Sequence, residues 1–250
     1  MESVRRQIRS GIGGRRARQN SWRLTADDSS SRTGRGWEKA VFSFPKGPLI
    51  GPLVVAGLLF DERGLSKLEE LGVRDSKLLT RRSRRSLSTR IVSIAEAYAI
   101  FEIQPQEIDS VVLRGRPMAR LNRLEAKIAA KIIDRLRPEI AYVDAPDRSP
   151  ERFACQILEG LKTPTRIVSE HHADRKYPVV SAASILAKVK RDEVIDELHK
   201  SYGDFGSGYP SDPKTTGFVK EWILRDGCNL PIVRRTWRTF RRLQRELTEG

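Results

Sequence analysis

The sequence predicts an α/β domain with a helical C-terminal part, and three observations lead to that prediction. The first is the continuous apolar run Leu53–Phe60, which is typical of a strand buried on both faces of a sheet. The second is the recurrence, further along the chain, of short apolar runs and of longer segments with apolar residues at helical spacing. The third is their order, because strands that alternate with helices indicate a sheet flanked by helices.

Each remaining element is predicted from its own pattern. A helix is expected to begin near Thr80 and to place Leu87, Ile91 and Ile94 on one side. The segment 121–136 carries leucine and isoleucine at helical spacing and predicts a second helix. Further strands are expected at 97–103, 140–143 and 166–169, and further helices at 150–161, 180–202, 217–225 and 233–247.

The composition favours a polyanionic partner and gives no sign of a membrane span. The formal net charge is +15, which favours nucleic acid because each neutralised phosphate releases a counterion. No stretch approaches the roughly 20 apolar residues of a membrane span, and no secretory signal is recognisable. Cys155 and Cys228 lie far apart without a metal-binding pattern, so a reducing, cytoplasmic setting is expected.

The chain is expected to divide into three parts. Residues 1–40 are predicted to be a disordered basic extension, because arginine, serine and glycine dominate them without any helical or strand period. This extension is either a nucleic-acid-binding arm or an artefact that is not native to the gene. Residues 41–203 are expected to form the main α/β domain, and residues 204–250 a loop and a helical subdomain.

Two aspartates follow predicted strands and are candidate metal ligands. Asp144 comes directly after 140–143, and Asp174 lies in a loop after 166–169. Ligand sites of open α/β sheets gather at such strand ends, and carboxylate oxygens suit magnesium or manganese. Asp144 could instead simply cap the next turn. Zinc is disfavoured, because the neighbouring histidines would point to opposite faces and no third ligand is suitably spaced.

The segment 205–214 predicts a stiff exposed loop that presents Tyr209. Glycines precede this tyrosine and two prolines follow it. An aromatic ring held in this way can stack on a sugar or base, and its hydroxyl can contact a 2′-OH. A turn with a packing tyrosine would show the same spacing, so the pattern leaves both interpretations open.

Taken together and in order, these segments resemble ribonuclease HII, and most of all its archaeal form. The resemblance covers roughly residues 46–240. The similar segments are 46–57, Asp75-Ser76-Lys77, 121–126, 176–188, 208–215 and 232–237. The run 176–188 (Lys-Tyr-Pro-Val-Val-Ser-Ala-Ala-Ser-Ile-Leu-Ala-Lys) is close to diagnostic of the family.

The resemblance implies a ribonuclease H-like fold: a mixed five-stranded sheet with flanking helices and a helical C-terminal subdomain. It implies an endonuclease that hydrolyses the phosphodiester 5′ of a ribonucleotide, in an RNA–DNA hybrid or in duplex DNA with embedded ribonucleotides. Two magnesium or manganese ions, held by carboxylates in the order Asp, Glu, Asp, Asp, support this reaction in the family. A monomer is expected, and residues 241–250 show no clear motif for docking to a sliding clamp.

By the same resemblance, Asp144 matches the third carboxylate and Asp174 the fourth, so both are expected to be catalytic metal ligands. Tyr209 matches the tyrosine that senses the 2′-OH. Lys46 and Gly47 match a substrate-binding loop that cooperates with this tyrosine, and Lys77 is expected to contact a phosphate.

The sequence departs from the family at the first two carboxylates. Counting back from Lys46, the expected Asp and Glu positions hold Phe42 and Ser43. Phenylalanine cannot bind magnesium, and serine is a poor substitute for a carboxylate. Two hypotheses follow: a ribonuclease HII that is active natively or through a substitute ligand, and a protein of the same fold that binds hybrids or junctions without cutting them.

Overall fold

The computed structural model describes residues 39–43, 47–73, 79–113 and 117–248. The predictions for residues 1–38, Lys46 and Lys77 therefore lie outside the described residues. Lys39 and Ala40, which fall inside the predicted extension, belong to the first strand.

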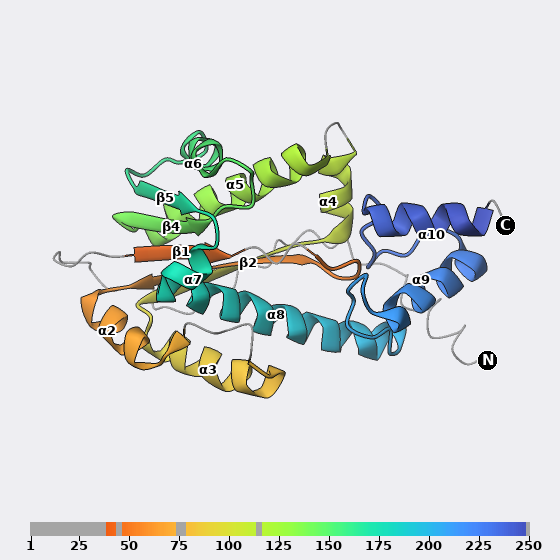
Figure 1. The fold of residues 1–250 in the computed structure, drawn as a ribbon, viewed down its shortest axis with the longest axis horizontal. Helices are drawn as coiled ribbons and strands as arrows, with labels where there is room; N and C mark the ends of the chain where they lie inside the picture. The colour runs from red at the N-terminus through yellow and green to blue at the C-terminus, as the bar shows by residue number, and fades with distance from the viewer. Residues whose placement is uncertain (1–38, 44–46, 74–78, 114–116, 249–250) are drawn as a thin grey trace, which may run out of the picture.

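A mixed five-stranded sheet forms the centre of the molecule, in the order β3-β2-β1-β4-β5 (Figure 1). β1 runs antiparallel to β2 and parallel to β4, while β2 and β3 are antiparallel and β4 and β5 are parallel. The strands span Lys39–Ser43 (β1), Leu53–Phe60 (β2), Ala97–Ile103 (β3), Ile140–Asp144 (β4) and Arg166–Glu170 (β5). The mixed sheet expected from the sequence is confirmed.

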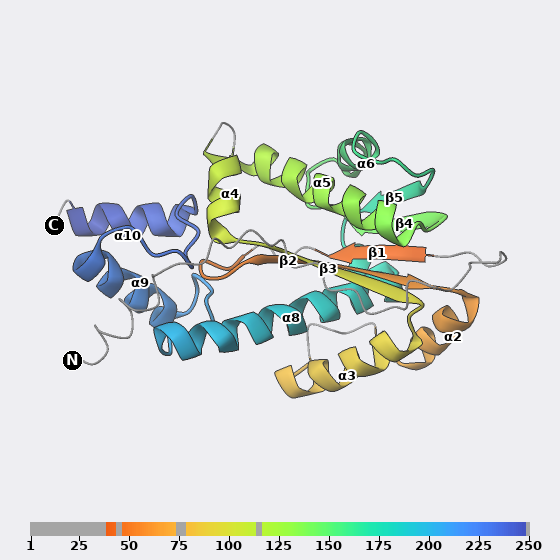
Figure 2. The ribbon, with the colours of Figure 1, turned by 180° about the vertical axis from the view of Figure 1, so that it is seen from behind.

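Helices cover both faces of this sheet (Figures 1 and 2). One face packs against α4 (Pro105–Val112), α5 (Pro117–Leu136) and α6 (Pro150–Leu158). The other packs against α2 (Glu62–Glu70), α3 (Arg81–Ile94) and α8 (Pro178–Tyr202). All eight residues of β2 are buried, and all of them except Gly57 alternate between the two hydrophobic clusters, which explains the continuous apolar run of this strand.

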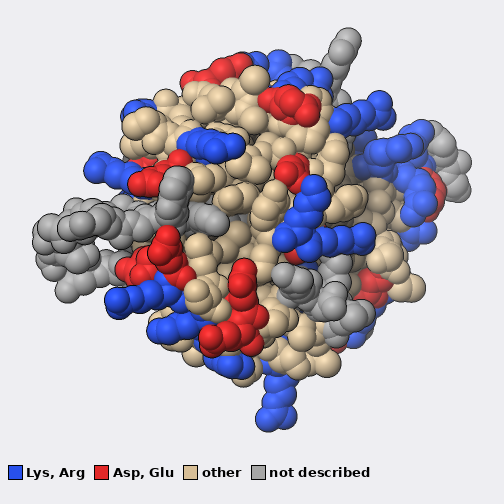
Figure 3. Space-filling model, turned by 60° about the vertical axis from the view of Figure 1, so that its left-hand side comes forward, with Lys and Arg blue, Asp and Glu red and all other residues tan. Residues whose placement is uncertain are grey.

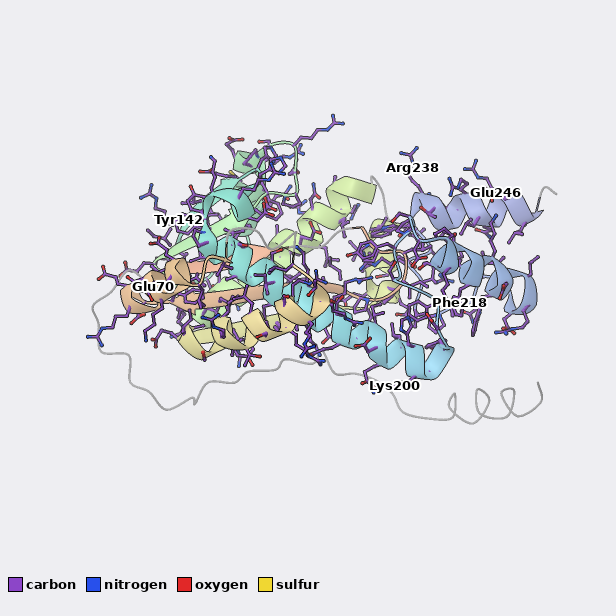
Figure 4. All side chains as sticks on the ribbon, turned by 60° about the horizontal axis from the view of Figure 1, so that its bottom comes forward. Glu70, Tyr142, Lys200, Phe218, Arg238 and Glu246 are labelled. Atoms are coloured by element: carbon purple, nitrogen blue, oxygen red, sulfur yellow. The ribbon has the colours of Figure 1, made fainter. Side chains whose placement is uncertain are left out.

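The C-terminal helices form a third cluster at one end of the molecule. α9 (Pro213–Asp226) and α10 (Arg238–Thr248) pack against the end of α8 and against Leu49 and Ile50. Phe218, labelled in Figure 4, belongs to this cluster and stacks beside Phe205 with ring centroids 5.6 Å apart. The helical C-terminal part is thus joined to the rest of the chain by apolar contacts.

Several predicted helices begin elsewhere. The helix expected from 180 begins at Pro178, and the helix expected from 217 begins at Pro213. The helix expected from 121 begins at Pro117, because proline is well tolerated in a first turn. The helix expected over 233–247 begins only at Arg238. Val233 instead forms a bridge with Ile50, and the Arg234 amide donates to the Leu49 carbonyl at 3.0 Å, so this backbone pairs with another segment.

Charge is mixed on the side of the molecule that Figure 3 shows. Basic and acidic side chains alternate there among uncharged ones, without a continuous field of one sign. Within the described residues, no helix is long and apolar enough to cross a membrane.

Candidate active site and substrate-facing loop

The ends of three parallel strands meet at one edge of the sheet. Phe42 is in register with Val143 of β4, and Asp144 with Glu170 of β5. Asp144 is the last residue of β4 and its side chain is partly exposed. The fold therefore places Asp144 where ligand sites of α/β sheets form.

A short helix, α7 (Ala173–Lys176), brings Asp174 to the same edge. The Ala173 amide donates a hydrogen bond of 3.2 Å to Oδ1 of Asp144, so the residue before Asp174 is fixed to the end of β4. His172 precedes the helix with φ 55°, in the left-handed region, and turns the chain sharply after β5. The structure thus brings the two predicted aspartates together.

A third carboxylate at this edge, that of Glu170, is held by its neighbours. Lys176 bonds to it, and the Tyr177 hydroxyl donates to Oε1 at 2.9 Å. The hydrogen bonds from Lys176 and, to a smaller extent, from Tyr177 lower the pKa of Glu170. The hydrogen bond to Glu170 in turn raises the pKa of Tyr177. Tyr142, labelled in Figure 4, packs on Tyr177 with ring centroids 4.6 Å apart. Glu170 is therefore anchored by Lys176 of α7 and by Tyr177, which follows this helix.

The turn after Asp144 is fixed by Asp147, which is 3% exposed. Asn122 donates to Oδ2 at 3.1 Å, the Ser149 amide to Oδ1 at 3.3 Å, and Arg152 bonds to both oxygens. Burial alone would raise the pKa of Asp147, but the hydrogen bonds from Arg152, Asn122 and Ser149 outweigh it and lower the pKa to about 2.

Asp147→Asn is expected to lower the free energy of unfolding at neutral pH by about 2 kcal/mol. The pKa is depressed in the folded state, so this stabilisation is present above the unfolded value of 3.8 and is lost as the pH falls through about 2. Urea unfolding should show a difference in the free energy of unfolding between the two proteins. This difference should become smaller as the pH is lowered from about 5 to about 3. Glu159→Gln, which removes an exposed carboxylate paired with Arg123, serves as a control and should change little. A difference that did not vary with pH would contradict this assignment.

The carboxylates gathered at this edge do not fit a site for two metal ions. Across residues 47–73, 79–113 and 117–248, no group of three or more His, Cys, Asp or Glu side chains could hold a metal ion. At the end of β1, between β2 and β4, the chain has Phe42 and Ser43, at the two positions where the family resemblance predicts a carboxylate pair. Asp144 and Asp174 are therefore the two predicted ligands that the described part of the chain supplies.

The loop that carries Tyr209 is fixed to the segment that follows Gly47. The amides of Leu49 and Ile50 both donate to the Gly208 carbonyl, at 2.8 and 3.0 Å. A Cβ on Gly47 would lie 3.4 Å from the Tyr209 ring, so glycine lets this backbone approach the ring closely. The structure thus brings together Gly47 and Tyr209, which are 162 positions apart in the sequence.

Side chains within the loop fix its shape as well. Thr215 is fully buried; its hydroxyl accepts from the Gly208 amide at 3.0 Å and donates to the Phe205 carbonyl at 2.9 Å. Asp212 caps α9 and also accepts from the Ser207 amide at 2.7 Å. Tyr209 is consequently presented, partly exposed, on a defined backbone.

A buried arginine lies beneath this junction. Arg234 is 0% exposed, and it donates to the carbonyls of Gly51 at 3.1 Å and Pro52 at 2.7 Å. Its guanidinium lies 4.9 Å from the centre of the Trp237 ring. Burial lowers the pKa of Arg234 to about 9. Arg234 therefore ties the C-terminal part to the start of β2.

Comparison with known proteins identifies the family. A family model described as Ribonuclease HII matches residues 45–240. The chain belongs to the ribonuclease HII family. Ribonuclease HII of Pyrococcus furiosus is 47% identical over 204 residues, which cover 81% of this chain and 88% of that protein. Ribonuclease HII of Thermofilum pendens is 45% identical over 203 residues, covering 80% and 95%.

Solved structures agree with this ribonuclease HII assignment. The ribonuclease H2 of Pyrococcus horikoshii OT3 superposes with a TM-score of 0.77 at 41% identity, covering 85% of this chain and 100% of that one. Ribonuclease HII in a PCNA complex from Archaeoglobus fulgidus gives a TM-score of 0.73 at 41% identity, covering 82% and 96%. A ribonuclease HIII in complex with Mn²⁺, at 17% identity and a TM-score of 0.72, shares the fold. The ribonuclease H-like fold and the endonuclease family expected from the sequence are confirmed.

Sequence reasoning assigned no role to two arginines of the ribonuclease HII fold. Arg234 lies in the segment 232–237, which signalled the family without revealing that its guanidinium is buried. Arg191 follows the segment 176–188 on α8, where arginine is usually exposed. The structure buries Arg191 to 4% exposure.

Proposed function

We propose that this chain recognises ribonucleotides within RNA–DNA hybrids or duplex DNA, as an endoribonuclease by descent. The observation that carries this proposal is the contact between Gly47 and Tyr209, which presents an aromatic ring and hydroxyl on a fixed loop. Such a group can stack on a sugar or base and form a hydrogen bond with the 2′-OH, which distinguishes RNA from DNA. Gly47 and Tyr209, with Lys46 and Lys77, are the proposed substrate-binding residues.

The reaction that the family performs is hydrolysis of the phosphodiester 5′ of the ribonucleotide. Asp144 and Asp174 are the residues that would hold magnesium or manganese, and bound metal would supply an activated water and charge stabilisation. With Phe42 and Ser43 at the positions where the resemblance predicts Asp and Glu, the two-metal donor set would be incomplete. We therefore propose that hydrolysis by this chain is severely impaired while recognition is retained. The alternative is a working nuclease in which an unidentified ligand replaces the missing pair.

The two parts of the chain are proposed to have different roles. Residues 41–203 would form the catalytic domain, and residues 204–250 would contribute the substrate-sensing loop and the helical subdomain. A sliding clamp is a candidate protein partner, because the Archaeoglobus fulgidus relative was solved in a PCNA complex.

The test uses duplex DNA with a single ribonucleotide and the matching all-deoxy duplex. The purified chain is expected to bind the ribonucleotide duplex more tightly and to show no cleavage with magnesium or manganese. Binding is followed by fluorescence anisotropy and cleavage by resolving the labelled strand. Cleavage 5′ of the ribonucleotide that Asp144→Asn abolishes would contradict the proposed impairment. Equal affinity for both duplexes would contradict the proposed recognition.

A further inference from the structure

Arg191 is a buried cation with few acceptors around it. It lies on α8 with 4% exposure, and burial lowers the pKa of its guanidinium. Nη2 donates to the Ser207 carbonyl at 3.0 Å, whereas Nε is buried and meets no acceptor in the described part of the chain. The carboxylate of Asp192 is 4.0 Å from Nη1. Burying a guanidinium with so little compensation is costly, so general stability alone is a poor reason for its presence.

The guanidinium instead lies against the ring of Tyr209. Its central carbon is 4.4 Å from the ring centroid, which is the distance of a cation–π contact. Arg191 therefore holds this loop at two points, the Tyr209 ring and the Ser207 carbonyl.

The loop backbone is shaped to admit this guanidinium. Gly208, between the two contact points, has φ +77°, and a Cβ there would lie 3.1 Å from Nη2 of Arg191. A larger residue at 208 would be strained and would crowd the arginine. Gly47 approaches the same ring from another segment, as described above. The ring of Tyr209 is thus confined by a charged side chain and by a backbone.

We propose that Arg191 is a positioning residue that sets the orientation of Tyr209 and thereby the preference of this chain for ribonucleotides. The proposal rests on the proposed function of Tyr209 in sensing the 2′-OH. The Tyr209 hydroxyl can form a hydrogen bond with a 2′-OH only at a suitable distance and angle, because a hydrogen bond weakens steeply when it is misaligned. An unconstrained ring on a glycine-rich loop would lose that alignment, whereas a stacked guanidinium with a second anchor keeps it.

The measured quantity is the ratio of dissociation constants for the all-deoxy duplex and for the duplex with one ribonucleotide, in the presence of EDTA. Arg191→Met is expected to lower this ratio about tenfold, the effect of about one lost hydrogen bond, with the affinity for all-deoxy duplex unchanged. Tyr209→Phe should lower it by a similar factor. The double variant should be no worse than Tyr209→Phe alone, because both changes remove the same interaction.

Two further variants separate positioning from general stability. Arg225→Met removes another arginine that lies over an aromatic ring, 4.8 Å from the centre of Trp222, and should leave the ratio unchanged. Arg191→Lys keeps the charge but not the planar group, and should give a partial loss even where Arg191→Met does not fold. Circular dichroism and thermal unfolding establish which variants are folded.

The outcomes are distinct. One outcome would overturn only the role of Arg191. In it, Tyr209→Phe loses the preference for the ribonucleotide duplex, whereas Arg191→Met keeps it. If Arg191→Met does not fold, Arg191→Lys takes its place in this comparison. A ratio that Tyr209→Phe retains, or that the parent chain lacks, would overturn the proposed function of Tyr209 and the role of Arg191 with it. Additive losses in the double variant would show that Arg191 acts on something other than Tyr209.

Discussion

The combined change Phe42→Asp and Ser43→Glu is expected to raise magnesium-dependent cleavage of a ribonucleotide-containing duplex by more than about a hundredfold, since loss of even the outer partners of metal ligands typically costs 10- to 100-fold. β1 lies between β2 and β4, and Phe42 is in register with Val143. The two positions therefore lie at the end of β1, next to the end of β4 that carries Asp144. The measurement is the initial rate of cleavage 5′ of the ribonucleotide.

Three controls define this result. Each single change should restore much less activity than the pair, because two metal ions share the carboxylates. Asp144→Asn in the doubly changed chain should abolish the gain. A folded double variant no more active than the parent would show that the two positions do not account for the impairment.

Arg234→Ala is expected to have the largest effect on stability, lowering the free energy of unfolding by about 3–5 kcal/mol. The change empties a fully buried site and leaves the carbonyls of Gly51 and Pro52 without their donor. Urea unfolding at neutral pH measures the loss. Arg235→Ala, the neighbouring arginine with a side chain 47% exposed, is the matched control and should cost less than about 1 kcal/mol. A similar small loss for both variants would contradict the anchoring role of Arg234.

Strong hydrophobic patterns in the sequence predicted the elements of the core. The strands β2 and β3 were expected at the bounds that the structure shows, because each has a long apolar or alternating pattern. α2 and α4 were not predicted. α2 and α4 are nine and eight residues long, and hydrophobic periodicity is a weak signal over such short segments.

The two aspartates of the candidate site could be predicted, because each of them follows a predicted strand. Asp144 and Asp174 were expected at the edge of the sheet, and the residue before Asp174 bonds to Asp144 through the Ala173 amide. The contact between Gly47 and Tyr209 followed from the family resemblance. The buried positions of Arg191 and Arg234 were not predictable, because arginine is usually exposed and only the tertiary structure reveals its acceptors.

The hydrogen bonds that fasten the Tyr209 loop also constrain when the protein can fold. Arg234 bonds to the Gly51 carbonyl across 183 residues of chain, and the amides after Pro48 bond to Gly208. Contacts of such long range close late and slow folding. During synthesis, all five strands of the sheet would have been made before the residues that are proposed to bind the substrate could come together. In the nascent chain, the end of the sheet that carries Asp144 would therefore be able to form before the loop that presents Tyr209.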